Sequence, residues 1–389
     1  MGKDLKGKEL GTGLCQKKDG RYSARFTRKN GSRIEKNFTK VTDAREWLTE
    51  QKYLDSTIGT GDMTVDDWYK HWIINFKKDI VAANTYKNYR IRYKKNIKDS
   101  IGKMKLYDVK QIHCQQILNE MYECAEYSRG TMEQTQITMH AIFKGAIENG
   151  YLYRNPAEGL KIKRRDNEEE RRVLTREEQR EFVEYAKDTM YGNAYRLVLQ
   201  TGLRPGEVGG LKWEDIDFEK RTIFVQRTLL QDPSKGGFYL GAPKTRDSKR
   251  IIPLTNEAIE IIKDQKQRQK KLRARSKDWD KTWDGLVFTT INGKPVGGST
   301  FRLMMIRIIN NINLDRKLDA NGKAFEEFKH AYMHALRHTF ATRCIENGMN
   351  PKALQKILGH STLAVTMDIY VHVTDDQRHL EMEKMNVAI

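Results

Sequence analysis

The residues with the clearest chemical potential lie close together near the end of the chain. His334 and Arg337 are three positions apart, so on a helix they would face the same way. His360 follows a glycine, and Tyr370 comes ten residues later. Cationic groups beside one phenol suit phosphate chemistry, in which the phenol attacks phosphorus and forms a covalent phosphotyrosine. The cluster predicts such a site, provided that other segments supply the rest of it.

Two basic residues upstream would complete this site. Arg204 stands directly before a Pro-Gly pair, in a constrained turn, and two arginines can clamp a phosphate with paired hydrogen bonds. Lys244 lies in a turn between two predicted strands, where a lysine could protonate the leaving oxygen. Lys235 and Lys249 flank the same turn and are alternatives for this role.

Single members of the cluster, taken one at a time, would also fit simpler roles. His334 and His338 have the spacing of a zinc-binding helix, but the glutamate expected after the first histidine is absent. Arg337, between the two, would repel a cation. A tyrosine near the end of a chain is more often structural than nucleophilic. The joint occurrence of these groups, in order, favours phosphate chemistry.

Composition points to a polyanionic partner. The 389 residues include 71 Lys+Arg against 52 Asp+Glu, a formal net charge of +19. Phosphate contacts scale with Lys and Arg, so nucleic acid is the first candidate. No apolar run approaches 18 residues and no signal-peptide pattern is present, which argues against a membrane protein. Four scattered cysteines suit reduced thiols in a cytoplasmic protein.

The sequence predicts a multidomain, mainly α-helical chain. After a flexible start of about ten residues, 1–56 would form a three-stranded sheet plus a helix. Residues 64–160 would form an all-α domain opened by a capping box, and the charged segment 161–172 an interdomain linker. Residues 173–389 would form a mainly helical domain with a small antiparallel sheet. The expected strands are 14–18, 21–28 and 34–38 in the first domain and 222–227, 238–240 and 250–254 in the last.

Basic side chains in the first two domains are candidates for DNA contact. Two-stranded ribbons fit the major groove, and a basic helix face can follow phosphates. A run of charges is often only a solvated face, and this alternative stays open for both domains. The candidates are Arg21, Arg25, Arg28 and Lys36 in the first domain and Arg90 and Lys94 in the second.

Three segments of the last domain resemble the boxes of the tyrosine recombinase (phage-type integrase) family, most of all the integrases of conjugative transposons. These are Thr201-Gly-Leu-Arg-Pro-Gly-Glu207, His334-Ala-Leu-Arg-His-Thr-Phe-Ala-Thr342 and Leu358-Gly-His-Ser361 through Tyr370. The Pro-Gly pair after Arg204 departs from the small or aliphatic residues that are more usual. Residues 64–160 look like the family's core-binding domain and 1–56 like its arm-type DNA-binding domain.

The resemblance implies a role for each residue of the site. A Pro-Lys-Thr turn followed by Ser-x-Arg-x-Ile-Pro-Leu matches the family's register and favours Lys244 over its neighbours. The implied roles are phosphate binding for Arg204 and Arg337, acid/base assistance for His334, phosphate ligation for His360, general acid for Lys244, nucleophile for Tyr370 and support of the site for Glu207.

The function implied by the resemblance is site-specific DNA recombination that integrates and excises a mobile element. Strands would be cleaved and rejoined through a 3′-phosphotyrosine and a Holliday junction, without metal or nucleotide cofactor. The implied partners are core-type and arm-type DNA sites, a homotetramer on DNA, an excisionase and a DNA-bending accessory protein, in the bacterial cytoplasm. A catalytically silent DNA-binding regulator with the same fold is the alternative, but it would lack polar groups that are all present here. A relaxing topoisomerase would need a large clamp, which is hard to fit beside a separate arm domain.

Overall fold

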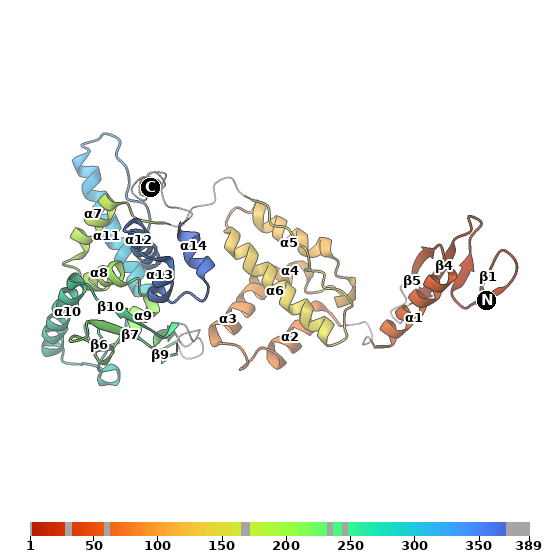
Figure 1. Cartoon of the computed structure of the whole chain (residues 1–389), viewed down its shortest axis with the longest axis horizontal. Coiled ribbons are helices and arrows are strands. Elements are labelled where there is room, and N and C mark those ends of the chain that lie inside the picture. Colours follow the sequence, from red (N-terminus) through yellow and green to blue (C-terminus); the bar gives the residue numbers. More distant parts are fainter. Residues whose placement is uncertain are drawn as a thin grey trace, which may run out of the picture. The chain divides into compact units, whose positions relative to one another are not determined.

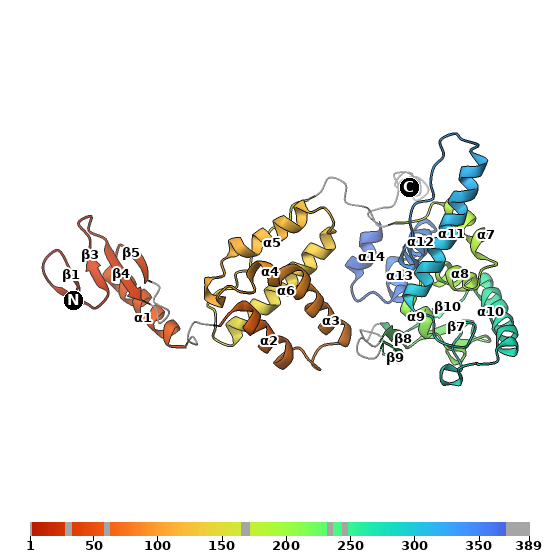
Figure 2. The ribbon, with the colours of Figure 1, turned by 180° about the vertical axis from the view of Figure 1, so that it is seen from behind.

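The computed structural model describes residues 2–27, 33–57, 63–164, 172–231, 236–242 and 248–370, with only the main chain at 50, 53–57, 368 and 370. The chain divides into two compact units, Met1–Glu168 and Glu169–Ile389. Figures 1 and 2 show the ribbon from opposite sides. The first unit contains a small sheet with one helix and a separate helical bundle, and the second is mainly helical.

A three-stranded antiparallel sheet lies near the start of the first unit, as predicted. Its strand order is β3-β4-β5, formed by β3 (Leu14–Gln16), β4 (Tyr22–Thr27) and β5 (Arg33–Phe38). Helix α1 (Val41–Thr57) packs against this sheet, as Figure 1 shows. Alternate residues of each strand face the helix, so one face is apolar. The buried residues of this core are Leu10, Leu14, Ala24, Ala44 and Leu48.

The first residues of the chain form a hairpin, so the expected flexible start is wrong. Strands β1 (Gly2–Lys3) and β2 (Glu9–Gly11) pair antiparallel. The carboxylate of Asp4 accepts hydrogen bonds from the main-chain N–H groups of Lys6 and Lys8, at 2.9 and 2.8 Å. The side chain of Asp4 closes the turn between these two short, polar strands. Strands of this kind have no alternating apolar residues, so the sequence pattern did not indicate them.

A helical bundle forms the rest of the first unit, as predicted. The capping box at Thr64 is present, with the N–H of Asp67 donating to the Thr64 hydroxyl at 3.1 Å. Trp68 and Trp72 are buried, and the Trp68 indole donates to the carbonyl of Ile142 at 2.9 Å. The helices are α2 (Val65–Asn75), α3 (Ala83–Arg92), the π-helix η1 (Tyr93–Ile97), α4 (Lys98–Ile101), the 3-10 helix η2 (Leu106–Asp108), α5 (Gln111–Glu123) and α6 (Arg129–Glu148).

The core of the second unit is built on aromatic residues from several helices. Tyr195 is fully buried, its ring lies 5.7 Å from Phe182, and its hydroxyl donates to the carbonyl of Phe301 at 2.8 Å. Thr175 caps α7. The helices are α7 (Arg176–Ala186), α8 (Gly192–Thr201), α9 (Pro205–Gly210), η3 (Trp213–Asp215), α10 (Asn256–Arg275), η5 (Lys281–Trp283), α11 (Gly298–Asp319), α12 (Met333–Glu346), α13 (Pro351–Leu358) and α14 (Leu363–Tyr370).

The described strands of the second unit form two small sheets. One sheet has the order β10-β7-β6, and the other pairs β8 with β9. The sequence predicted that the strands on either side of Lys244 are neighbours, but β9 pairs with β8 and β10 with β7. The predicted pairing is wrong because it left out β8. The strands are β6 (Ile216–Asp217), β7 (Thr222–Val225), β8 (Thr228–Gln231), β9 (Phe238–Gly241) and β10 (Arg250–Pro253).

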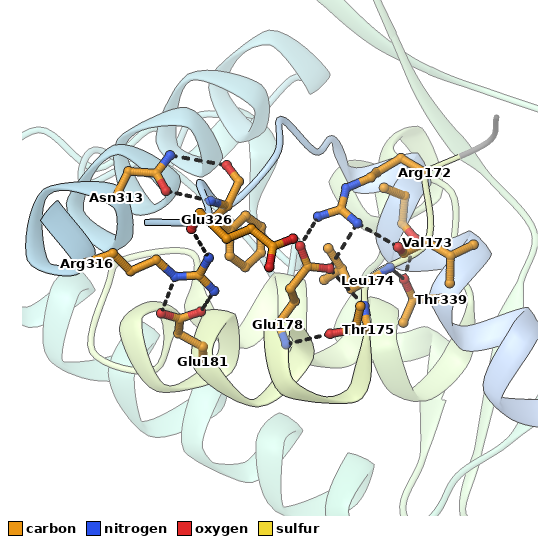
Figure 3. A network of polar contacts seen from close by, with 12 residues as sticks. Arg172, Val173, Leu174, Thr175, Glu178, Glu181, Asn313, Arg316, Glu326 and Thr339 are labelled. Carbon is orange, nitrogen blue, oxygen red and sulfur yellow. Dashed lines mark hydrogen bonds and ion pairs between the residues drawn. The ribbon is translucent and has the colours of Figure 1, made fainter. Parts of the chain in front are cut away.

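The segment before α7 is hydrogen-bonded to helix α12, which carries His334 and Arg337. The N–H of Leu174 donates to the hydroxyl of Thr339 at 2.9 Å, and Arg343 donates to the carbonyl of Leu174 at 2.7 Å. Figure 3 shows the first of these contacts within a larger polar network. The main chain at Leu174 is therefore bound to α12 through both of its polar groups.

Arg172, the last residue of the predicted linker 161–172, takes part in the same network (Figure 3). It donates to Glu178 of α7 at 2.9 Å, and its guanidinium lies 5.7 Å from the ring centre of Phe328. Arg316 of α11 lies 5.6 Å from the same ring. Because 165–171 lie outside the described residues, the linker stays a prediction over that segment.

Candidate active site

Arg204 is held at the start of the short helix α9. Helix α8 ends at Gly202, whose φ of +64° favours glycine, and a Cβ there would lie 2.5 Å from the ring of Phe340. The N–H of Arg204 donates to Glu207 at 2.8 Å and its Nη1 to the same carboxylate at 2.9 Å. Its side chain is still 34% exposed, so part of the guanidinium faces solvent.

Arg337 links the turn before Arg204 to the end of α13. Its Nη1 donates to the carbonyl of Gly202 at 2.6 Å, and its Nη2 to the carbonyl of Leu358 at 2.7 Å. Burial, and then the charge of Arg204, lowers the pKa of Arg337 to about 9. Arg337 remains protonated at neutral pH, so it adds positive charge close to Arg204.

His360 lies where α13 ends. The helix stops at Gly359, with φ +65°, and Arg204 donates to the carbonyl of this glycine at 3.0 Å. The Nδ1 of His360 lies 3.0 Å from the hydroxyl oxygen of Thr366 on α14. Burial, followed by the charges of Arg337 and Arg204, lowers the pKa of His360 to about 4. The imidazole is therefore neutral at pH 7 and can donate one hydrogen bond.

His334 lies one helical turn before Arg337 on α12, at an exposed position. The surrounding protein desolvates its charged form, and Arg337 and Arg204 repel it, so the pKa of His334 is lowered. A neutral imidazole at an exposed position can accept or donate a proton at pH 7. His338 is half-buried, and its charge contributes to lowering the pKa of His360.

A buried ion pair lies beneath these groups, and the sequence predicted only one of its members. The side chains of Glu207 and Arg250 are 3% and 5% exposed. Arg250 donates to both carboxylate oxygens, at 2.9 and 2.8 Å. Burial alone would raise the pKa of Glu207, but the hydrogen bonds and charge of Arg250, together with Arg204, hold that pKa below its usual value. Arg250 opens the Arg-Ile-Ile-Pro-Leu segment, which in the sequence serves only to place the turn around Lys244.

The structure thus brings Arg204, His334, Arg337 and His360 together from α9, α12 and the end of α13. Tyr370 is the last residue of α14, and only its main chain is described. The residue before it, Ile369, is 5% exposed and belongs to a buried cluster with residues of α12 and α13, so α14 packs on its own chain. Lys244 lies outside the described residues.

Two of the predicted DNA-binding arginines of the first unit are exposed and already paired. Arg21 lies 2.7 Å from Asp19, and Arg25 lies 2.9 Å from Glu35 on the neighbouring strand. Pairs this exposed are weak and exchange readily for other partners such as phosphates. Arg28 lies outside the described residues.

The remaining DNA-binding candidates lie on different surfaces. In the register of β4 and β5, Lys36 pairs with Ala24, whose side chain is buried in the core with α1. Lys36 therefore lies on the opposite face of the sheet from Arg25. In the helical bundle, Arg90 on α3 and Lys94 on η1 are both exposed.

Within the segments that the structure describes, no group of three or more His, Cys, Asp or Glu side chains could hold a metal ion. Among the same residues, no helix is both long and apolar enough to cross a membrane.

Comparison with known proteins identifies the family. The model of the phage integrase family matches residues 172–377, which include every predicted site residue of the second unit. The chain belongs to this family. A second model, the N-terminal SAM-like domain of phage integrases, matches residues 64–122 within the helical bundle.

Relatives narrow the assignment within the family. The chain is 30% identical to a XerC-like tyrosine recombinase of Caldanaerobacter subterraneus, covering 92% of this chain and 93% of that protein. It is 29% identical to the transposase of transposon Tn916 from Enterococcus faecalis, covering 99% and 96%. The chain is a tyrosine recombinase of the conjugative-transposon type, an enzyme that cleaves and rejoins DNA strands, as the sequence predicted.

Solved structures agree with this assignment. The integrase of transposon Tn1549, in complex with transposon right end DNA, superposes with a TM-score of 0.70 at 27% identity, over 83% of this chain and 100% of that chain. A lambda integrase tetramer bound to a Holliday junction shares the fold, with a TM-score of 0.54 at 17% identity, over 93% and 95%. The predicted fold class, mainly α with a small N-terminal sheet and a small catalytic-domain sheet, is confirmed.

Proposed function

We propose that this chain integrates and excises a mobile DNA element, with the site around Arg204 and Arg337 binding the phosphate that is cut. The observation that carries this proposal is the convergence of two guanidinium groups through the carbonyls of Gly202, Leu358 and Gly359. These contacts hold two cations close together at a position that is partly open to solvent. Such a preorganised pair would stabilise the negative charge of a pentacoordinate phosphorus.

The covalent step requires a nucleophile and an acid. The hydroxyl of Tyr370 would attack the phosphorus and give its proton to the neutral imidazole of His334. A 3′-phosphotyrosine bond would form while the bond from phosphorus to the 5′ oxygen breaks. Lys244 would give the departing 5′ oxygen its proton. A 5′ hydroxyl from another strand would then attack the phosphotyrosine and release Tyr370, so bond energy is retained without a metal or nucleotide cofactor.

The two histidines would assist this step in different ways. His360 is held by Thr366 and is neutral at pH 7, so it would donate a hydrogen bond to a phosphate oxygen. His334 is exposed beside Arg337 and also has a lowered pKa, so it would exchange protons with the reacting groups. Glu207 would support the site by holding Arg204 through its main chain and its side chain.

We further assign a role to each domain. Residues 1–56 would bind arm-type sites through Arg21, Arg25, Arg28 and Lys36. Residues 64–160 would bind core-type sites through Arg90 and Lys94, and 173–389 would cut and rejoin strands. Four copies would act together, because each chain supplies one Tyr370 and a full exchange between two duplexes cuts four strands. An excisionase and a DNA-bending protein would decide between integration and excision. The reaction would take place at the nucleoid.

Trapping of a covalent adduct tests this function. The full chain is incubated with a nicked duplex that carries the junction of the element's ends. After cleavage, the short strand with the free 5′ hydroxyl diffuses away at the nick, so religation is prevented. Wild type should form an adduct that survives denaturation, and Tyr370→Phe should form none. A wild type that binds the duplex without forming any adduct would identify the catalytically silent regulator, and an equal adduct in Tyr370→Phe would exclude Tyr370 as the nucleophile.

A further inference from the structure

We propose that Arg250 is a positioning residue for recombination. Its buried side chain fixes the positions of Arg204 and His360 relative to each other. The inference rests on the proposed function and deepens it. Arg250 is the first residue of β10, and its side chain is 5% exposed. Its Nε, Nη1 and Nη2 all donate to protein acceptors already, so its effect on the reaction passes through the residues that it contacts.

The first set of contacts leads to Arg204. Both terminal nitrogens of Arg250 donate to Glu207, at 2.9 and 2.8 Å, and Glu207 in turn accepts from the main chain and side chain of Arg204. One carboxylate is thus shared by two guanidinium groups. Because Arg250 takes up much of the negative charge, Arg204 keeps net positive charge for a phosphate. Without Arg250, Glu207 would neutralise Arg204 and could rotate towards it.

The second set of contacts leads to His360. The Nε of Arg250 donates to the carbonyl of Ile357 in the last turn of α13. A Cβ built on Gly359 would lie 3.1 Å from Cδ of Arg250 and 3.2 Å from its Nη1, so the arginine packs flat against this turn. His360 is the next residue along the chain. Arg250 therefore fixes the position of the turn that leads into His360.

A third contact concerns the strand itself. The Nη1 of Arg250 also donates to the carbonyl of Ser248 at 3.2 Å, which holds the chain just before β10. One buried guanidinium thus joins the N-terminal end of α9, the C-terminal end of α13 and the approach to β10. These three segments are far apart in sequence, and the first two lie next to Arg204 and His360.

Positioning predicts a change in rate without a change in DNA affinity. The test uses Arg250→Lys, which keeps the charge but cannot make the paired contact, and Arg250→Met, which removes the charge. At saturating nicked duplex, adduct formation should slow by about 100-fold, since misplacement by about 1 Å costs that much. The dissociation constant for the duplex should stay within about twofold of wild type. The inference is wrong if Arg250→Lys forms the adduct at the wild-type rate. It is also wrong if the rate of adduct formation and the affinity for the duplex fall by the same factor.

Coupling to Arg204 separates positioning from general loss of structure. If Arg250 acts through Arg204, then Arg204→Lys with Arg250→Lys should be no more than about threefold slower than Arg204→Lys alone. Rate losses that multiply in the double variant would overturn the proposal.

Arg316→Lys is the matched control. Arg316 also makes a paired contact, with Glu181, but on α7 and α11. It should keep the wild-type rate of adduct formation. If Arg250→Met does not fold, Arg250→Lys carries the test. Wild type that forms no adduct would contradict the proposed function, whereas an active wild type with unaffected Arg250 variants would contradict only this inference.

Discussion

Replacing Glu207 by glutamine should destabilise the second unit strongly, because it leaves a buried arginine without its counter-charge. Glu207 and Arg250 are almost fully buried and joined by two hydrogen bonds. Breaking one partner of such a pair costs about 3–5 kcal/mol. Glutamine keeps one acceptor oxygen, so we expect about 3 kcal/mol. At about 1.4 kcal/mol per factor of ten, the equilibrium between folded and open states shifts by roughly 100-fold.

Hydrogen exchange read by mass spectrometry can follow this change within the full chain. Peptides from α8 and α12 report on the second unit separately from the first. At pH 7 their slowest amides should lose about 100-fold of protection in Glu207→Gln. Glu184→Gln is the matched control, because Glu184 forms an exposed pair with Lys187 and its loss should leave protection unchanged.

The pH dependence of this difference has a definite sign. The pKa of Glu207 is lowered on folding, so its stabilising effect is fully present above the unfolded value of about 4.3 and is lost as pH falls through the folded value. The difference in protection between wild type and Glu207→Gln should be constant from about pH 6 to 8 and should disappear under more acidic conditions. Equal protection of the two proteins at pH 7 would refute the reasoning.

Two further predictions concern Thr339 and His360. Thr339→Val removes the acceptor of the buried Leu174 N–H and should cost about 1–3 kcal/mol by hydrogen exchange, whereas Thr339→Ser should retain most of the stability. The pKa of His360 is lowered to about 4, so its contribution to stability is present above about pH 6.5 and is lost as pH falls towards 4. A proton NMR titration should show the midpoint for His360 near 4, and a midpoint near 6.5 would contradict the burial and charges described for this site.

Local signals in the sequence predicted the parts of the fold that depend on neighbouring residues. The capping box at Thr64 involves a partner three residues away, so it can be recognised from the sequence alone. The glycines before Arg204 and His360 are local signals of the same kind, because both adopt positive φ where a helix ends. These turns bring Arg204 and His360 to the site.

The sequence was less informative where the partner lies far along the chain. Glu207 and Arg250 are 43 residues apart, and no period or spacing rule connects an acid on a helix to an arginine on a strand. Strand β8 has four residues, too few for alternation to distinguish it from a loop, so the pairing of β9 was assigned wrongly. The family resemblance supplied the order of the site residues but not the buried contacts that hold them.

The contacts at Leu174 define where the catalytic part of the chain can be separated from the rest. A fragment that begins at the first residue of α7 would leave the hydroxyl of Thr339 without its donor and Arg343 without the carbonyl that it binds. It would also uncover Phe328, over which Arg172 lies. The thermodynamic boundary of the unit therefore precedes its first helix, and an autonomous catalytic fragment must start no later than Arg172.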